Sequence, residues 1–332
     1  MPELPEVQTV VSDLNEKIIG DTITAFWSEW PKAIKCKTLA VFTKEIVGRK
    51  ILGVRRIGKN IFIDLSGNKT LYLHLKMTGH LLIKTTSQEL SSSQGKAGQE
   101  LSSKGGKDYF ADKVNQYIRH KWTLKTKNHP PRLAETRLDS TRCLIKSKRA
   151  TARRCEAGKL KTIEFSDVRK FAKIVLDDTD KIAQLPEIKS LGVDAISAEF
   201  ILTKFNKILD RKAKSPIGII LMDQHLIAGI GNIYRSEILF EAGILPTRKA
   251  GTVSITERKK LFQMIEKIMQ KAIKLRGTSD SDYRDTAGAP GGFQKIMKMY
   301  RHDGKKCPKC GTIIMRDTIG QRAVFFCPSC QK

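Results

Sequence analysis

Long apolar segments are missing from this sequence of 332 residues. Runs such as Ile61–Leu65 and Leu71–Leu75 are interrupted far short of the roughly 20 apolar residues that a membrane-spanning helix needs. The first residues include Glu3 and Glu6 and form no apolar segment of the kind that a signal peptide requires. We therefore expect a cytoplasmic protein with no transmembrane segment and no membrane partner.

Acidic residues are also scarce. The sequence has 34 Asp and Glu against 61 Lys and Arg, which gives a formal charge of +27 at pH 7. An excess of this size favours association with a polyanion, and nucleic acid is the leading candidate. At roughly 100–200 residues per domain, the chain is long enough for about two domains with substantial cores.

Cysteine is uncommon, and its odd number argues against a framework of disulfides. Three of the seven, Cys36, Cys143 and Cys155, stand alone and are expected to be free thiols. The other four form two C-x2-C pairs, which supply four thiolates to a tetrahedral Zn²⁺ and leave no position for water or substrate. We predict one structural zinc ion with these ligands: Cys307, Cys310, Cys327 and Cys330.

The periodicity of apolar residues changes along the chain. Residues 4–19 have helical spacing, whereas short apolar segments over residues 22–83, 161–165 and 171–176 predict antiparallel strands. Helical patterns resume after residue 186, with expected starts at Ser197, at Pro216 and at a capping box that begins with Ser254. The order of these segments predicts an α+β protein.

Two polar stretches interrupt the β region. Residues 85–108 are rich in Ser, Gly, Gln and Lys, and residues 127–160 are rich in Lys and Arg. The first reads as a flexible insertion, and the second is either an additional DNA contact or a tolerated surface loop. We divide the chain into a β domain at 1–180 that carries both insertions, a helical domain at 181–290 with a mobile loop at 278–292, and a zinc-binding segment at 291–332.

The N-terminal segment Pro2-Glu3-Leu4-Pro5-Glu6 permits two interpretations. If Met1 is removed, Pro2 exposes a secondary amine, and α-amino groups titrate near pH ~8, so a useful fraction is a neutral nucleophile. Glu3 and Glu6 could then transfer protons. The alternative is an ordinary helix start with acidic residues at the positive end of the helix dipole.

A resemblance over nearly the whole chain favours the first interpretation. The sequence resembles the bacterial formamidopyrimidine-DNA glycosylases of the Fpg/Nei family in the order and spacing of seven motifs. They are Met1–Val7, Arg56–Lys59, Leu73–Gly79, Asp167–Phe171, Leu221–Gln224, Gly229–Tyr234 and Gln321–Arg322. The resemblance implies an N-terminal antiparallel β-sandwich, a helix-two-turn-helix module and a C-terminal four-cysteine zinc finger, with DNA between the two halves, and a nucleoid-associated bacterial protein.

The resemblance also implies a mechanism. Pro2 attacks C1′ of the damaged nucleotide, expels the base and forms a Schiff base, after which β,δ-elimination cuts the strand. Glu3 donates a proton to the opening sugar, and Lys59 is a catalytic cation at the flanking phosphate. Glu6 assists proton transfer, and Arg322 contacts phosphate and aids the proton chemistry. From spacing alone Lys59 would be a solvated lysine at a turn. Arg322, near the tip of the zinc hairpin, would be either a bidentate clamp for a phosphate or a solvated arginine.

DNA-binding roles follow from the same resemblance. His74 and Asn232 match phosphate contacts. Met77, Arg169 and Phe171 match the residues that enter the base stack when the lesion is flipped out, and loop 278–292 matches the segment that covers it. Without the resemblance, Met77 and Phe171 would be assigned to the core and Arg169 to the solvated surface. His74 would be a strand histidine whose hydrogen bonds are satisfied within the fold.

One motif departs from the family. Gly218 stands where members usually carry a lysine, which puts base preference in doubt.

We expect a monomeric glycosylase/AP lyase that excises oxidised purines, 8-oxoguanine and formamidopyrimidines, from double-stranded DNA. One alternative is a Nei-type enzyme for oxidised pyrimidines, and the other is a noncatalytic damage-binding protein.

Overall fold

The computed structural model describes residues 2–85, 108–126, 160–280 and 282–332. Apart from their end residues, the two insertions expected at 85–108 and 127–160 lie outside these ranges. Over the described residues, no helix has both the length and the apolar character needed to cross a membrane.

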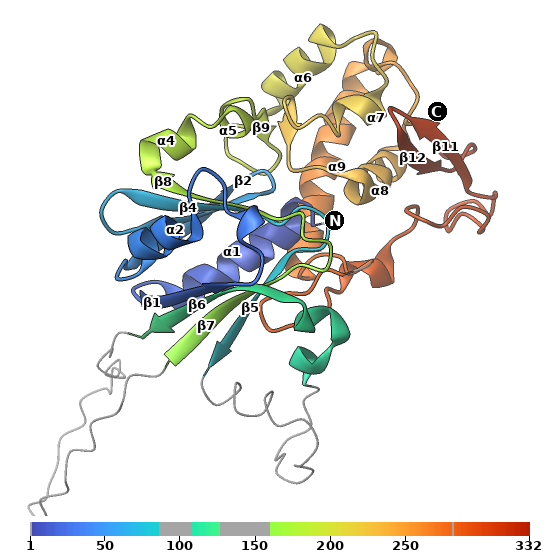
Figure 1. The fold of residues 1–332 in the computed structure, drawn as a ribbon. Coiled ribbons are helices and arrows are strands. Elements are labelled where there is room, and N and C mark those ends of the chain that lie inside the picture. The colour runs from blue at the N-terminus through green and yellow to red at the C-terminus, as the bar shows by residue number, and fades with distance from the viewer. Residues whose placement is uncertain (1, 86–107, 127–159, 281) are drawn as a thin grey trace, which may run out of the picture.

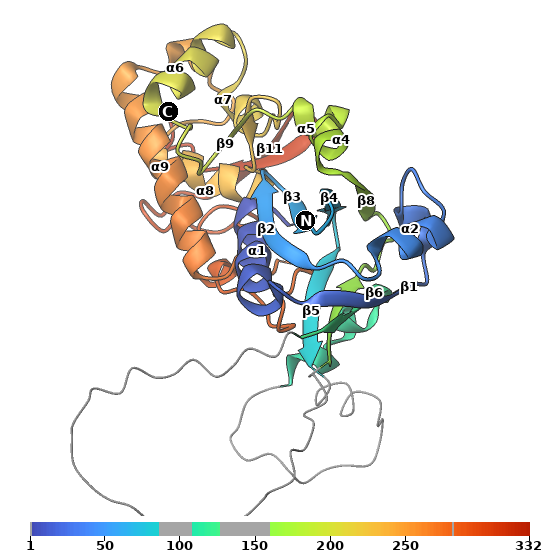
Figure 2. The same ribbon diagram turned by 90° about the vertical axis from the view of Figure 1, so that its left-hand side faces the viewer.

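The N-terminal half is a sandwich of two antiparallel sheets (Figures 1 and 2). The apolar pattern predicts antiparallel strands here, and the family resemblance implies the sandwich. Its core is built from the inward-facing residues of both sheets, among them Ile61, Leu73, Leu81 and Phe165. One sheet has the order β1 (Thr22–Ser28), β6 (Ile118–Lys125), β7 (Leu160–Ser166), β5 (His80–Thr85). The other has the order β2 (Ile51–Ile57), β3 (Asn60–Leu65), β4 (Lys69–His74), β8 (Lys173–Asp178).

Helix α1 (Leu4–Ile18) joins this sandwich to the helical half. Its apolar residues at helical spacing, including Val7, Val10 and Leu14, are all buried. Glu3 is the N-cap, and the side chain of Glu6 closes a capping box with it. Because α1 packs on β2 and also on α9 (Ile255–Lys274), its first turn lies in the middle of the molecule (Figure 1).

The helical half follows the expected order, with one correction. The capping box at Ser254 opens α9, and Gly243 ends α8 (Asn232–Ala242) in the left-handed conformation that a glycine C-cap favours. Ser197, however, starts no helix, because its backbone and hydroxyl both donate to the Asp194 carbonyl and close a turn. The remaining elements here are α6 (Leu202–Arg211), α7 (Ile217–Ile220) and a parallel pair of β9 (Val193–Asp194) and β10 (Ile227–Ala228).

The zinc-binding segment carries the hairpin β11 (Met315–Ile319) and β12 (Arg322–Phe326). Gly320 and Gln321 both have positive φ angles, as a two-residue type I′ turn requires, and Arg322 follows directly. Phe325 packs against Phe240 of α8 and so fixes the hairpin on the helical half. The shorter helices are α2 (Leu39–Ile46), α4 (Thr179–Ala183) and α5 (Pro186–Lys189), with 3₁₀ turns at Pro31–Ala33, Tyr109–Ala111, Lys113–Gln116, Ala250–Thr252 and Phe293–Ile296.

Candidate active site and nucleic-acid interface

The first turn of α1 and the first turn of α8 meet at the centre of the molecule. The Glu3 carboxylate accepts hydrogen bonds from the backbone N–H of Ile233 (3.0 Å) and Tyr234 (3.5 Å), at the positive end of α8. Gly231 makes this approach possible, because a Cβ there would lie 2.3 Å from Cδ of Glu3. Glu3 and Pro2 are both buried. The carboxylate of the predicted proton donor is therefore held by backbone N–H groups, and the predicted nucleophile is buried next to it in the chain.

Glu6 is buried beside Glu3. Its carboxylate accepts hydrogen bonds from the Tyr234 hydroxyl (2.5 Å) and from the backbone N–H groups of Thr278 (2.7 Å) and Glu3 (2.7 Å). Burial, with the nearby charge of Glu3 as the second cause, raises the pKa of Glu6 to about 7 and outweighs these hydrogen bonds. A carboxyl group with this pKa can accept or release a proton near neutral pH.

Lys59 reaches the same centre from the turn between β2 and β3. It is 8% exposed, and its Nζ donates to the Ile230 carbonyl (3.1 Å), in the turn that also holds Glu3. Burial lowers the pKa of Lys59, and the negative charges of Glu3 and Glu6 oppose that change. The lysine, the two carboxylates and Arg322, which also lowers this pKa, are thus close enough to influence one another.

His74 lies on β4 opposite Asn60, the residue after Lys59. Its Nδ1 accepts a hydrogen bond from the backbone N–H of Lys76 (2.9 Å), and burial lowers its pKa to about 3. The imidazole is therefore neutral at physiological pH, and its proton belongs on Nε2. This tautomer can donate a hydrogen bond to a phosphate oxygen.

Met77, Arg169 and Phe171 come together on the surface of the sandwich. Nη1 of Arg169 lies 3.3 Å from the Met77 sulfur, and its guanidinium lies 5.0 Å from the centre of the Phe171 ring. Met77 is 39% exposed and Phe171 is 51% exposed, so assignment of these two side chains to the core is wrong. Buried Asp167 shapes the loop by accepting hydrogen bonds from the backbone N–H of Arg169 and Ala172.

A pocket of about 350 Å³ is lined by Glu3, Met77 and Arg169 from these groups. It brings residues from the sandwich, α8, the loop after α9 and the zinc hairpin to one place. Arg301 and Asp280 form an ion pair (2.7 Å) at its wall. The lining residues are Glu3, Met77, Thr78, Arg169, Met222, Asn232, Ile233, Asp280, Asp282, Tyr300, Arg301 and Arg322.

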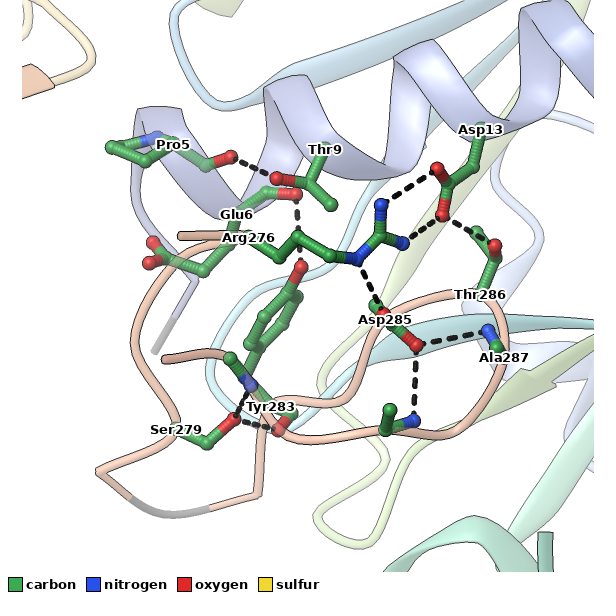
Figure 3. Close-up of polar contacts among 12 residues, drawn as sticks. Pro5, Glu6, Thr9, Asp13, Arg276, Ser279, Tyr283, Asp285, Thr286 and Ala287 are labelled. Carbon is green, nitrogen blue, oxygen red and sulfur yellow. Dashed lines mark hydrogen bonds and ion pairs between the residues drawn. The ribbon is translucent and has the colours of Figure 1, made fainter. Parts of the chain in front are cut away.

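The segment at 278–292 is anchored over much of its length, in contrast to the mobile loop expected from its composition (Figure 3). Arg276 forms ion pairs with Asp13 of α1 (2.5 Å) and with Asp285 (2.7 Å). Thr286 donates to Asp13, and the Tyr283 hydroxyl donates to the carbonyl of Glu6. These contacts join the segment to α1.

The four cysteines of the two C-x2-C pairs form one cluster, with all four sulfurs within 4.8 Å of one another. The Sγ atoms of Cys310 and Cys327 are 3.4 Å apart, and those of Cys307 and Cys330 are 3.9 Å apart. Thiolates bound at about 2.3 Å around a tetrahedral zinc ion have a similar separation. The residues therefore fit one structural Zn²⁺, which would hold the hairpin that presents Arg322.

Comparison with known families gives the same order of parts. Residues 1–174 match the formamidopyrimidine-DNA glycosylase N-terminal domain, residues 191–283 match its H2TH domain, and residues 304–332 match the zinc finger found in FPG and IleRS. The chain belongs to the formamidopyrimidine-DNA glycosylase family. The expected β-sandwich, helix-two-turn-helix module and four-cysteine zinc finger are thereby confirmed.

Relatives match this family member over its full length. The formamidopyrimidine-DNA glycosylase of Carboxydothermus hydrogenoformans is 32% identical, and the match covers 100% of both chains. The formamidopyrimidine-DNA glycosylase of Pelotomaculum thermopropionicum is 33% identical, and the match covers 100% of this chain and 99% of the relative. The Lactococcus lactis Fpg complex with DNA containing an abasic site has a TM-score of 0.73 at 26% identity, with 99% of each chain covered. Its complex with Fapy-dG-containing DNA has the same TM-score and identity, with 99% and 100% covered.

In this glycosylase family member, the roles of three residues escaped sequence reasoning. Tyr234 and Thr278 hold Glu6. Tyr234 ends one of the family motifs and Thr278 begins the loop at 278–292, but neither pattern indicates a contact with Glu6. Arg235 is buried although it is charged, and it donates to the carbonyl of Gly218 (3.3 Å). Helix α8 also contains polar residues such as Ser236 and Glu237, so no pattern in the sequence distinguished Arg235.

Proposed function

We propose that this protein is a bifunctional DNA glycosylase/AP lyase that excises oxidised purines from double-stranded DNA and acts as a monomer. The observation that carries the proposal is the convergence of Glu3, Glu6 and Lys59 around the start of α1, beside the pocket. The relative from Lactococcus lactis, bound to Fapy-dG-containing DNA and to abasic DNA, supports the choice of substrate.

The reaction begins after Met1 is removed and Pro2 has a free amine. The neutral amine attacks C1′, the C1′–N bond to the damaged base breaks, and an iminium ion links Pro2 to the sugar. Glu3 supplies a proton to the sugar oxygen as the ring opens. Glu6, whose pKa is about 7, exchanges protons with this centre. The iminium acidifies the C2′ protons, so that the 3′ and then the 5′ phosphate are eliminated.

The surrounding groups bind DNA in this proposal. Lys59, neutral His74, Asn232 and Arg322 contact phosphates around the flipped nucleotide. Met77, Arg169 and Phe171 enter the stack that the damaged base has left, which their exposure supports. The basic surface of the protein adds attraction that does not depend on sequence.

The test is strand incision on three matched duplexes, which carry 8-oxoguanine opposite cytosine, a formamidopyrimidine, or an oxidised pyrimidine. We expect cleavage of the first two, with phosphate left at both ends of the gap by β,δ-elimination. Preferential cleavage of the pyrimidine lesion would support the Nei-type alternative instead. Tight binding without cleavage of any duplex, including abasic DNA, would leave a noncatalytic damage-binding protein.

A further inference from the structure

Arg235 lies inside the first two turns of α8 and is 1% exposed. Its guanidinium donates hydrogen bonds to three neighbours from different parts of the chain. They are the side-chain oxygen of Asn232, the Ala323 carbonyl of β12 (2.9 Å) and the Gly218 carbonyl of α7 (3.3 Å). One side chain thus connects the helical module to the zinc hairpin at the edge of the pocket.

Within the described part of the chain, no carboxylate forms an ion pair with Arg235, although Glu3 is close enough to influence its charge. Burial lowers its pKa to about 10, an effect that Glu3 opposes and Arg322 reinforces, so the side chain remains cationic at neutral pH. A buried cation is costly unless its donors find hydrogen-bond acceptors, and Arg235 uses three neutral oxygen atoms for this purpose. Asn232, which Arg235 contacts, and Arg322, the residue before Ala323, both line the pocket.

Arg235 also determines which way the Asn232 amide faces. A guanidinium can only donate hydrogen bonds, so the Asn232 atom that it contacts must be the carbonyl oxygen. The amide NH₂ group then faces the other way, on the side where Asn232 is close enough to Tyr300 to oppose the rise in the pKa of its hydroxyl that burial causes. Tyr300 and Asn232 both line the pocket. Asn232 therefore presents donors, the groups that a phosphate oxygen needs, to the pocket.

Gly218 explains why the cation comes from α8 in this chain. A Cβ at position 218 would lie 2.7 Å from Cδ1 of Ile319 and 2.9 Å from the Pro246 carbonyl oxygen, so no lysine side chain fits there without moving the backbone. The glycine lets the zinc hairpin pack closely on α7. The guanidinium of Arg235 occupies the neighbouring space and uses the Gly218 carbonyl as an acceptor.

We propose that Arg235 is a positioning residue for the DNA backbone, which orients the Asn232 amide and holds the hairpin beside Arg322 so that both can bind a phosphate. This inference rests on the proposed function and deepens it. Arg235 acts through Asn232 and the Ala323 carbonyl and does not touch the reacting atoms.

The experiment is a double-mutant cycle with Arg235→Met and Asn232→Ala. Affinity is measured by fluorescence anisotropy on a duplex with a tetrahydrofuran abasic-site analogue. We expect each single variant to lose about tenfold in affinity, as for the loss of a hydrogen bond to a charged group. The double variant should lose clearly less affinity than the product of the two single losses, because part of the effect of Arg235 passes through Asn232. Arg211→Met, which removes the same charge from the exposed surface of α6, is the control and should bind like the wild type.

Two results would overturn the inference: unchanged affinity of Arg235→Met, or losses that multiply in the double variant. Melting temperature and zinc content identify variants that do not fold. If Arg235→Met is among them, the cycle is run with Arg235→Lys, which keeps the charge but cannot reach three acceptors, and the same coupling is expected. A wild-type protein that does not bind the abasic duplex would instead contradict the proposed function itself.

Discussion

The two sides of the pocket differ in how their functional groups are held. On the side of α1, Glu3, Glu6 and Lys59 are buried and hydrogen-bonded to backbone groups before any ligand is present. On the side of the sandwich surface and the zinc hairpin, Phe171 and Arg322 are exposed. The first arrangement suits proton transfer and covalent chemistry, which need fixed geometry. The second suits contacts that form only when DNA arrives.

Among the substitutions that test this contrast, Gly231→Ala is expected to have the largest effect. Its methyl group would displace the Glu3 carboxylate from the α8 N-terminus. A misplacement of about 1 Å costs about 100-fold in rate, so we expect at least that loss of base excision in single-turnover assays. Gly53→Ala, with no atom within 4 Å of the added Cβ, is the matched control and should keep full activity. Equal rates in the two variants would show that Glu3 needs no such precision.

The pH dependence of stability tests the buried side separately. Since the pKa of Glu6 is about 7 in the folded protein against an ordinary 4.5, ionisation is more costly there than in the unfolded chain. Protonated Glu6 therefore favours the folded protein. This contribution to the free energy of unfolding is fully present below pH 4.5, and about 3 kcal/mol of it is lost as the pH rises through 7. Urea unfolding between pH 4.5 and 8.5 should show this decline in the wild type and in the exposed control Glu266→Gln. Glu6→Gln should lack it, and a decline that persists there would assign the titration to another group.

Lys59→Met should have the next largest effect. Loss of a charge-assisted hydrogen bond to a phosphate corresponds to about 1.5–3 kcal/mol, or about 10- to 100-fold in kcat/KM. The buried alkyl chain of methionine keeps the packing, so the melting temperature should change little. Lys44→Met, on the exposed face of α2, controls for the change in net charge. A variant at position 59 that matched this control in rate would remove Lys59 from the catalytic centre.

The smallest effect is expected on the exposed side. Phe171→Ala should lower excision about fivefold, since stacking of a base on this half-exposed ring is expected at the low end, about 1 kcal/mol, of the range for base–aromatic stacking. Because the ring is half exposed, the free energy of unfolding should change by less than about 0.5 kcal/mol. Phe165→Ala, in the sandwich core, should instead cost about 3–5 kcal/mol of stability. Comparable destabilisation by the two substitutions would mean that Phe171 is a core residue after all.

Local patterns predicted much of this architecture. The spacing of Val7, Val10 and Leu14 predicted α1, and the capping box at Ser254 predicted the start of α9, because both signals depend on neighbours within a few residues. The two C-x2-C pairs likewise predicted the zinc cluster. Ser197 misled the helix assignment because a turn with Asp194 uses the same side chain.

Features that depend on distant contacts could not be predicted. Glu6 has its raised pKa because the fold buries it among Glu3, Tyr234 and Thr278, which are distant in sequence except for Glu3. The composition of 278–292 suggested mobility, whereas ion pairs of Arg276 with Asp13 and Asp285 hold this segment. Arg235 could not be assigned a role before its acceptors on β12 and α7 were known.

The most direct test of the central claim is borohydride trapping of the Met1-processed protein on duplex DNA that carries 8-oxoguanine opposite cytosine. We expect a covalent protein–DNA adduct that mass spectrometry locates at Pro2. A protein that retains Met1 should form none, because its Pro2 nitrogen is part of an amide. No adduct on either oxidised or abasic DNA, or an adduct at an internal lysine, would contradict the claim that the N-terminal proline is the nucleophile.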